Sequence, residues 1–95
     1  MSDYWWSVAT GKVSPFSKAS RKAVEFMSKQ EGFKGAKGVD NHGMLWFYDT
    51  ENNAKGARNM ARLKGIKCGN NICRFKVMDD GALEMDDPRY NEVRK

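Results

Sequence analysis

Side chains that carry chemistry are scarce in this sequence of 95 residues, which has one histidine and two cysteines. His42, Cys68 and Cys73 fall short of the four ligands of a structural zinc site and lack the paired spacing that such sites use. The single histidine and the scattered carboxylates form no recognisable nucleophile–base pair or carboxylate pair. We therefore expect a protein that is not an enzyme and that holds neither a metal ion nor a cofactor.

Long apolar runs are also missing. No segment approaches the ~20 apolar residues that cross a membrane, and no basic stretch followed by an apolar one opens the chain as in a secretion signal. We expect a cytoplasmic protein with free thiols, because disulfides persist mainly in oxidising compartments. The acidic residues near the C-terminus do not have the spacing of a calcium loop and are typical of a solvated acidic segment.

Positive charge is in excess and unevenly distributed. The formal net charge is +5, but residues 1–78 carry 14 basic and 6 acidic side chains, whereas residues 79–95 carry 3 basic and 6 acidic ones. A basic body with an acidic end favours an anionic partner, either a nucleic acid or an acidic protein. Solubility alone is the other explanation for such a charge.

Hydrophobic periodicity predicts strands and helices in alternation. Helices are expected from Pro15 to Glu31, after a cap at Ser14, and from a cap at Thr50 or Asp49 to Leu63. Strands are expected over residues 4–10, 33–39, 44–49 and 71–78, with a short edge strand over 82–85. This order predicts an α+β, ferredoxin-like βαββαβ sandwich, with two helices on one face of a four-stranded antiparallel sheet. Residues 1–86 are expected to form a single domain and 87–95 a tail.

Two families resemble this architecture. The strand "HGMLWFYD", residues 42–49, has the glycine and aromatics of the third-strand octamer of RNA-recognition motifs but not its basic residue. The loop "TGKVSPFS", residues 10–17, is similar to the phosphate-binding loop of acylphosphatases, because Gly11, Lys12 and a helix N-terminus suit an anion. It lacks that family's arginine, and Asn41 falls in a predicted turn. We assign the chain to neither family.

Side chains of a strand alternate between the two faces of its sheet. We expect the more apolar sets beneath the helices, and they are Tyr4, Trp6 and Val8, then Leu45 and Phe47, then Cys73, Phe75 and Val77. The assignment of the last strand rests on charge, because basic side chains are costly to bury. The remaining side chains are then expected on an open face, which carries Trp5, Trp46, Tyr48, Arg74 and Lys76.

Aromatic rings interleaved with basic groups on a sheet suit stacked bases and their phosphates. We therefore predict a non-catalytic module that binds single-stranded nucleic acid, RNA or DNA, on this face. The alternative for these rings is cover by Ala82–Met85 or by a second copy, and we expect a monomer or a weak homodimer. A secondary basic surface is expected on the helices, at Lys18, Arg21, Lys22, Lys55, Arg58 and Arg62.

A second function is consistent with the same features. A small basic domain without a recognisable reactive site also suits a protein-binding regulator or inhibitor, of the kind that phages and mobile elements encode against a larger nucleoprotein machine. The sequence names no target for it.

Overall fold

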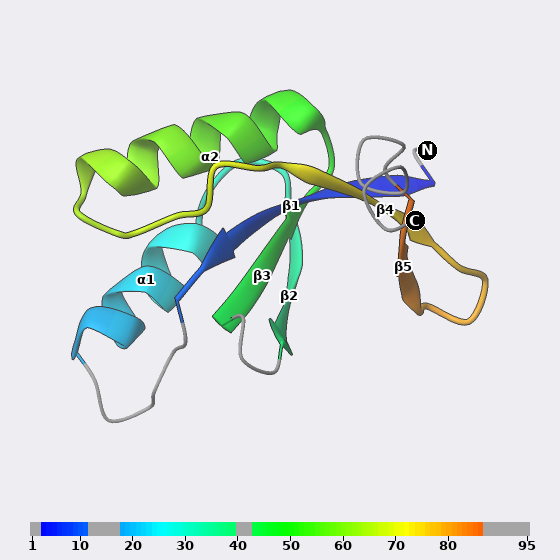
Figure 1. Ribbon diagram of the computed structural model, residues 1–95, viewed down its shortest axis with the longest axis horizontal. Coiled ribbons are helices and arrows are strands. Elements are labelled where there is room, and N and C mark those ends of the chain that lie inside the picture. Colours follow the sequence, from blue (N-terminus) through cyan, green and yellow to red (C-terminus); the bar gives the residue numbers. More distant parts are fainter. Residues whose placement is uncertain (1–2, 12–17, 40–42, 87–95) are drawn as a thin grey trace.

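Five strands and two helices make up the described part of this computed structural model, residues 3–11, 18–39 and 43–86. They follow the chain as β1 (Tyr4–Thr10), α1 (Lys18–Ser28), β2 (Phe33–Val39), β3 (Gly43–Tyr48), α2 (Glu51–Leu63), β4 (Cys73–Val77) and β5 (Leu83–Met85) (Figure 1). Each element overlaps the range that its periodicity predicts. The predicted cap of the first helix, at Ser14 and Pro15, and the predicted tail lie outside the described residues.

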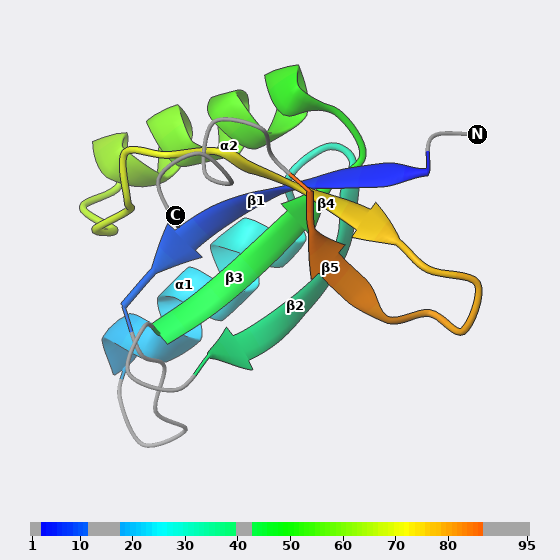
Figure 2. The same ribbon diagram turned by 45° about the vertical axis from the view of Figure 1, so that its right-hand side comes forward.

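The strands form one antiparallel sheet with the order β2-β3-β1-β4-β5. The predicted four-stranded ferredoxin-like sandwich is wrong, because the strands form a five-stranded sheet that curls into a half-barrel. The short edge strand expected over 82–85 is present as β5. Figure 2 shows the curl, with β5 running at a steep angle to β3. A bulge in β2 between Phe33 and Gly35 contributes to it, since bulges increase strand twist.

Both helices pack on the same face of this sheet (Figures 1 and 2). Ala54, Ala57 and Ala61 form the buried stripe of α2, and their short side chains allow the helix backbone to approach the sheet closely. Met27 is the buried anchor of α1 in the same core. This alanine stripe is the contact between α2 and the sheet.

A polar joint connects the end of α1 to the start of α2. The backbone N–H of Asp49 donates to the Gly32 carbonyl at 2.9 Å, and Asn53 Nδ2 donates to Asp49 Oδ1 at 2.8 Å. Gly32 has φ +81°, which residues with a Cβ rarely adopt, and a Cβ there would overlap Asp49 Oδ1, so glycine is strongly favoured. The predicted cap of α2 is confirmed next to this joint, where Thr50 Oγ1 accepts from Asn53 N at 3.0 Å.

Candidate anion-binding surface

Trp46 and Tyr48 lie in the core beneath the helices, where they are 1% and 0% exposed. Trp46 Nε1 donates to Thr10 Oγ1 at 2.8 Å, and the Tyr48 hydroxyl donates to the Met27 carbonyl at 2.7 Å. Burial raises the pKa of Tyr48 far above its ordinary value. The prediction that these two rings face outward is therefore wrong. Alternation defines two sets in β3, but it does not show which set the helices cover.

The last strand is also reversed relative to the prediction. Arg74 and Lys76 pair with Trp6 and Tyr4, so their side chains lie on the helix-bearing face of the sheet. The Arg74 guanidinium lies over the Tyr4 ring, 4.4 Å from its centroid, and Arg74 Nε donates to the Asp86 carbonyl at 2.8 Å. Burial of charge did not forbid this arrangement, because Arg74 is only partly buried and Lys76 is exposed.

Cys73, Phe75 and Val77 consequently face away from the helices, with Trp5, which pairs with Phe75. Of the five residues predicted on the open face, Trp5 alone lies on the side opposite the helices, where it is half-buried. The structure does not bring Trp5, Trp46, Tyr48, Arg74 and Lys76 together on one surface.

The face opposite the helices is itself packed. Phe47 of β3 is 1% exposed, and its ring lies 5.2 Å from that of Phe75 on β4 and 6.1 Å from that of Trp5. β1 runs between β3 and β4, so two rings this close must lean across it. Ser7 is buried at that point, and its small side chain leaves them room. Met85 pairs with Phe75 at the edge of this cluster, within the segment that was expected to shield it.

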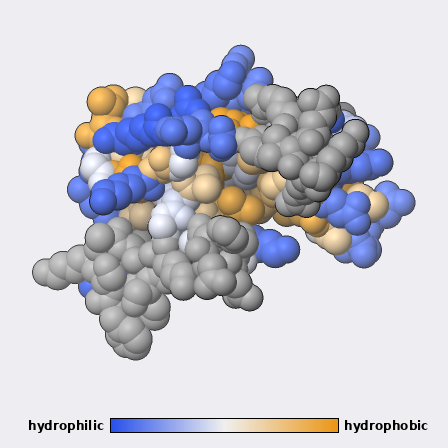
Figure 3. All heavy atoms as spheres, in the orientation of Figure 1, coloured by the Kyte–Doolittle hydropathy of each residue, from blue (hydrophilic) through white to orange (hydrophobic). Residues whose placement is uncertain are grey.

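Basic side chains are concentrated on α2 and in the loop after it. Residues 51–72, which form α2 and the loop after it, contain five basic side chains and only one acidic one, Glu51. Figure 3 shows hydrophilic atoms along the top of the molecule, where Figure 1 places α2. We define the basic surface by Lys55, Arg58, Arg62 and Lys67. Sequence reasoning missed Lys67, which follows the helix in the loop.

Two arginines of this surface also hold the loop that follows α2. Arg58 Nη1 donates to the Asn70 carbonyl at 2.9 Å, and Arg62 Nη2 contacts Asn70 Oδ1 at 2.7 Å and the Gly69 carbonyl at 3.1 Å. Both guanidiniums are thereby fixed in place while they stay near the surface. Lys55 is more loosely placed, 3.7 Å from Glu51 across one helical turn.

The basic residues predicted on α1 form a separate group. Arg21 and Lys22 are exposed, whereas the side chain of Lys18 lies outside the described set. Lys29 forms an exposed ion pair with Glu25 at 3.0 Å. The described basic side chains of α1, Arg21 and Lys22, thus lie at the surface.

Neither Cys68 nor Cys73 forms a disulfide, and the two lie in different surroundings. The backbone of Cys68 forms an isolated β-bridge with Thr10, and its side chain packs against the helix-side core. Cys73 lies opposite Ser7 in the strand pair β1–β4, and its side chain is on the face away from the helices. Burial raises the pKa of the Cys68 thiol, and the nearby Arg62 guanidinium partly opposes that rise.

Across residues 3–11, 18–39 and 43–86, no group of three or more His, Cys, Asp or Glu side chains is placed to hold a metal ion. His42, Lys12 and Asn41 lie outside these ranges.

No helix within the same ranges is long and apolar enough to cross a membrane. No protein-family model, curated protein or solved structure matches this chain. The functional assignment therefore depends on the geometry and charge described above.

Proposed function

We propose that this protein is a non-catalytic nucleic-acid-binding module that contacts phosphates through the basic surface of α2 and the loop after it. The observation that carries the proposal is a set of four basic side chains on α2 and in the loop after it, Lys55, Arg58, Arg62 and Lys67, with Glu51 as the only acidic side chain in residues 51–72. Neutralising phosphates with such groups releases counterions and supplies most of the affinity of sequence-independent binding.

The arrangement of these side chains also favours binding. Arg58 and Arg62 are held by loop carbonyls, so they lose less conformational freedom when a phosphate arrives. Residues 79–86 of the β4–β5 hairpin carry four acidic side chains and no basic one. Because the acidic hairpin and the basic α2 lie in different parts of the molecule, electrostatic attraction and repulsion would orient α2 toward a polyanion. The cytoplasmic location expected from the sequence is part of this proposal.

The test is fluorescence anisotropy with labelled 20-nucleotide single-stranded RNA, single-stranded DNA and duplex DNA over a range of salt concentrations. We expect affinity to fall steeply as salt rises. The double variant Lys55→Glu/Lys67→Glu should weaken binding at least about tenfold and reduce the salt slope by about 2, roughly one per lost phosphate contact. It leaves both loop-holding arginines in place.

The matched control is Lys34→Glu/Lys37→Glu, which makes the same change of charge at two exposed positions of β2. Equal losses in the two double variants would show that net charge alone attracts the oligonucleotides, and would contradict an α2 site. Absence of binding to all three probes at about 50 mM salt would contradict the proposed function itself. The three probes also distinguish a single strand from a duplex.

A further inference from the structure

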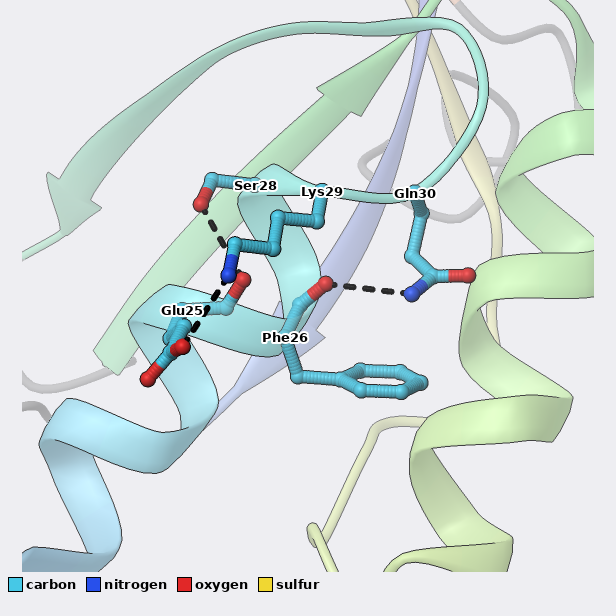
Figure 4. Close-up of polar contacts among 5 residues, drawn as sticks. All are labelled: Glu25, Phe26, Ser28, Lys29 and Gln30. Atoms are coloured by element: carbon cyan, nitrogen blue, oxygen red, sulfur yellow. Dashed lines mark hydrogen bonds and ion pairs between the residues drawn. The ribbon is translucent and has the colours of Figure 1, made fainter.

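A groove lies between the two helices, on the flank of α2 away from the loop. Its volume is about 310 Å³, and it is lined by Lys22, Glu25, Phe26, Lys29 and Gln30 from α1 and its C-terminal end, and by Lys64 at the end of α2. Figure 4 shows the α1 side of this groove, with the Phe26 ring directed toward α2. The basic surface lies on the other flank, where Arg58 and Arg62 meet the loop.

The groove carries excess positive charge. Lys29 is paired with Glu25 at 3.0 Å, so the local charges of these two side chains offset each other. Lys22 and Lys64 have no ion pair within the described part of the chain, and they come from different helices. The backbone of Lys64 is fixed, because its N–H donates to the Ala61 carbonyl at 3.0 Å. Two ammonium groups on opposite sides of a groove would attract carboxylates or phosphates.

Apolar side chains beside the groove distinguish between these two anions. Met60 lies one helical turn before Lys64, on the same side of α2, and is 46% exposed. Leu63, the last residue of α2, is 78% exposed. A phosphate backbone gains nothing from exposed aliphatic side chains, whereas a peptide that carries its own apolar residue buries them. The mixture of Phe26, Met60 and Leu63 with lysines therefore favours a peptide.

We propose that this groove binds an acidic segment of a partner protein, in which carboxylates flank one or two apolar side chains. The apolar side chains pack on Phe26 and Met60, and the carboxylates lie against Lys22 and Lys64. Gln30 contributes a polar contact: its Nε2 donates to the Phe26 carbonyl at 3.1 Å, and its carbonyl oxygen is directed toward α2, where it can accept a peptide N–H (Figure 4).

The probe is a fluorescein-labelled eight-residue peptide with two central leucines flanked on each side by three glutamates. We expect it to bind with a dissociation constant of about 10–100 μM, because a groove of this size buries less surface than a standard interface. Two control peptides test the two components: lysines in place of the glutamates, or serines in place of the leucines, should each weaken binding at least about tenfold.

Charge reversal at the groove supplies the structural test. Lys22→Glu/Lys64→Glu should weaken binding of the acidic peptide at least about tenfold, whereas Lys55→Glu/Lys67→Glu on the other flank should change it less than about threefold. Met60→Ser is a milder variant, at a half-exposed side chain, and should weaken binding about two- to fivefold through the apolar contact. Circular dichroism confirms that each variant is folded.

Three results would overturn this proposal: no binding at about 1 mM peptide, equal losses in the two double variants, or equal binding of the serine peptide. Displacement of the peptide by single-stranded DNA, combined with loss of DNA binding in Lys22→Glu/Lys64→Glu, would assign the groove to nucleic acid instead. Because the two proposals use different flanks of α2, either can fail while the other stands.

Discussion

The two faces of the sheet both bury aromatic rings, but they stabilise them by different means. On the helix-bearing face, Trp46 and Tyr48 each make a buried hydrogen bond, to Thr10 and to the end of α1 respectively. On the other face, Phe47 and Phe75 pack edge to face without any polar group on their rings. One face therefore depends on apolar packing together with specific polar partners, whereas the other depends mainly on ring packing across a curled sheet.

This difference shows that the polarity of an aromatic side chain is a poor guide to the face it occupies. The indole and phenol groups suggested that Trp46 and Tyr48 would face outward. Each has one polar atom, and a single well-placed partner removes the penalty for burying it. The Met27 carbonyl is in the last turn of α1, where helix carbonyls have no partner within the helix. The Tyr48 hydroxyl fills that need, so one hydrogen bond satisfies two groups.

Truncation of a ring on either face should have the largest effect on stability. We expect Trp46→Ala and Phe47→Ala each to lower the free energy of unfolding by about 3–5 kcal/mol, because each leaves a cavity in a packed region. Urea denaturation followed by circular dichroism measures the change. If these variants do not fold, Trp46→Phe and Phe47→Leu should still show losses of about 1–2 kcal/mol. A loss below about 1 kcal/mol for Trp46→Ala would mean that this ring is exposed in solution, as the sequence suggested.

Removing the buried hydroxyl group from one face, or adding a hydroxyl group to the other, should lower stability less than truncating a ring does. Tyr48→Phe should lower the free energy of unfolding by about 1–2 kcal/mol, because it leaves the buried Met27 carbonyl without its donor. Phe47→Tyr should cost about 1–3 kcal/mol, because a hydroxyl enters a cluster of rings. Both are measured by urea denaturation. If Tyr48→Phe leaves stability unchanged, the hydrogen bond does not distinguish the two faces.

The smallest expected effect is a dependence of the free energy of unfolding on pH, which comes from two buried groups on the helix-bearing face. Burial raises the pKa of both Tyr48 and Cys68, so the folded protein keeps protons that the unfolded chain releases at high pH. Stability from this source is fully present below about pH 8, and it falls as pH rises past the ordinary pKa of a thiol, about 8.5, and of a phenol, about 10. Urea denaturation between pH 8 and 9.5 should therefore show a declining free energy of unfolding.

The matching variants separate this effect from other titrations. Cys68→Ala should make the decline shallower over that range, and Tyr48→Phe should act mainly at its upper end. Cys73→Ala, on the opposite face, is the control for removal of a thiol. An equal decline in wild type and Cys68→Ala would show that the buried thiol contributes nothing to the pH dependence.

The sequence by itself determined the local structure. The strand expected over "MLWFYD", the helix expected up to Leu63 and the cap at Thr50 all correspond to elements that the structure contains. These signals are local, because a strand period, a helix period and a cap each depend on residues a few positions apart. The basic residues of α2 were also found in the sequence as a helical stripe. Their contacts with the loop at Asn70 were not, because no periodicity encodes them.

Only the tertiary structure decided which sides of β3 and β4 are the helix-bearing sides, whereas the set with Trp6 and Val8 in β1 was expected there and lies there. Both sets of side chains in β3 are apolar enough to be buried, so a period of two leaves the choice open. The choice is made by distant residues: Thr10, 36 positions before Trp46, and Met27, 21 positions before Tyr48. The curl of the sheet likewise depends on pairing between segments, whereas the short strand that became β5 was expected from the sequence. The groove between the helices exists only because Lys22 and Lys64, distant in sequence, are brought to the same place by the packing of α1 and α2 on one face of the sheet.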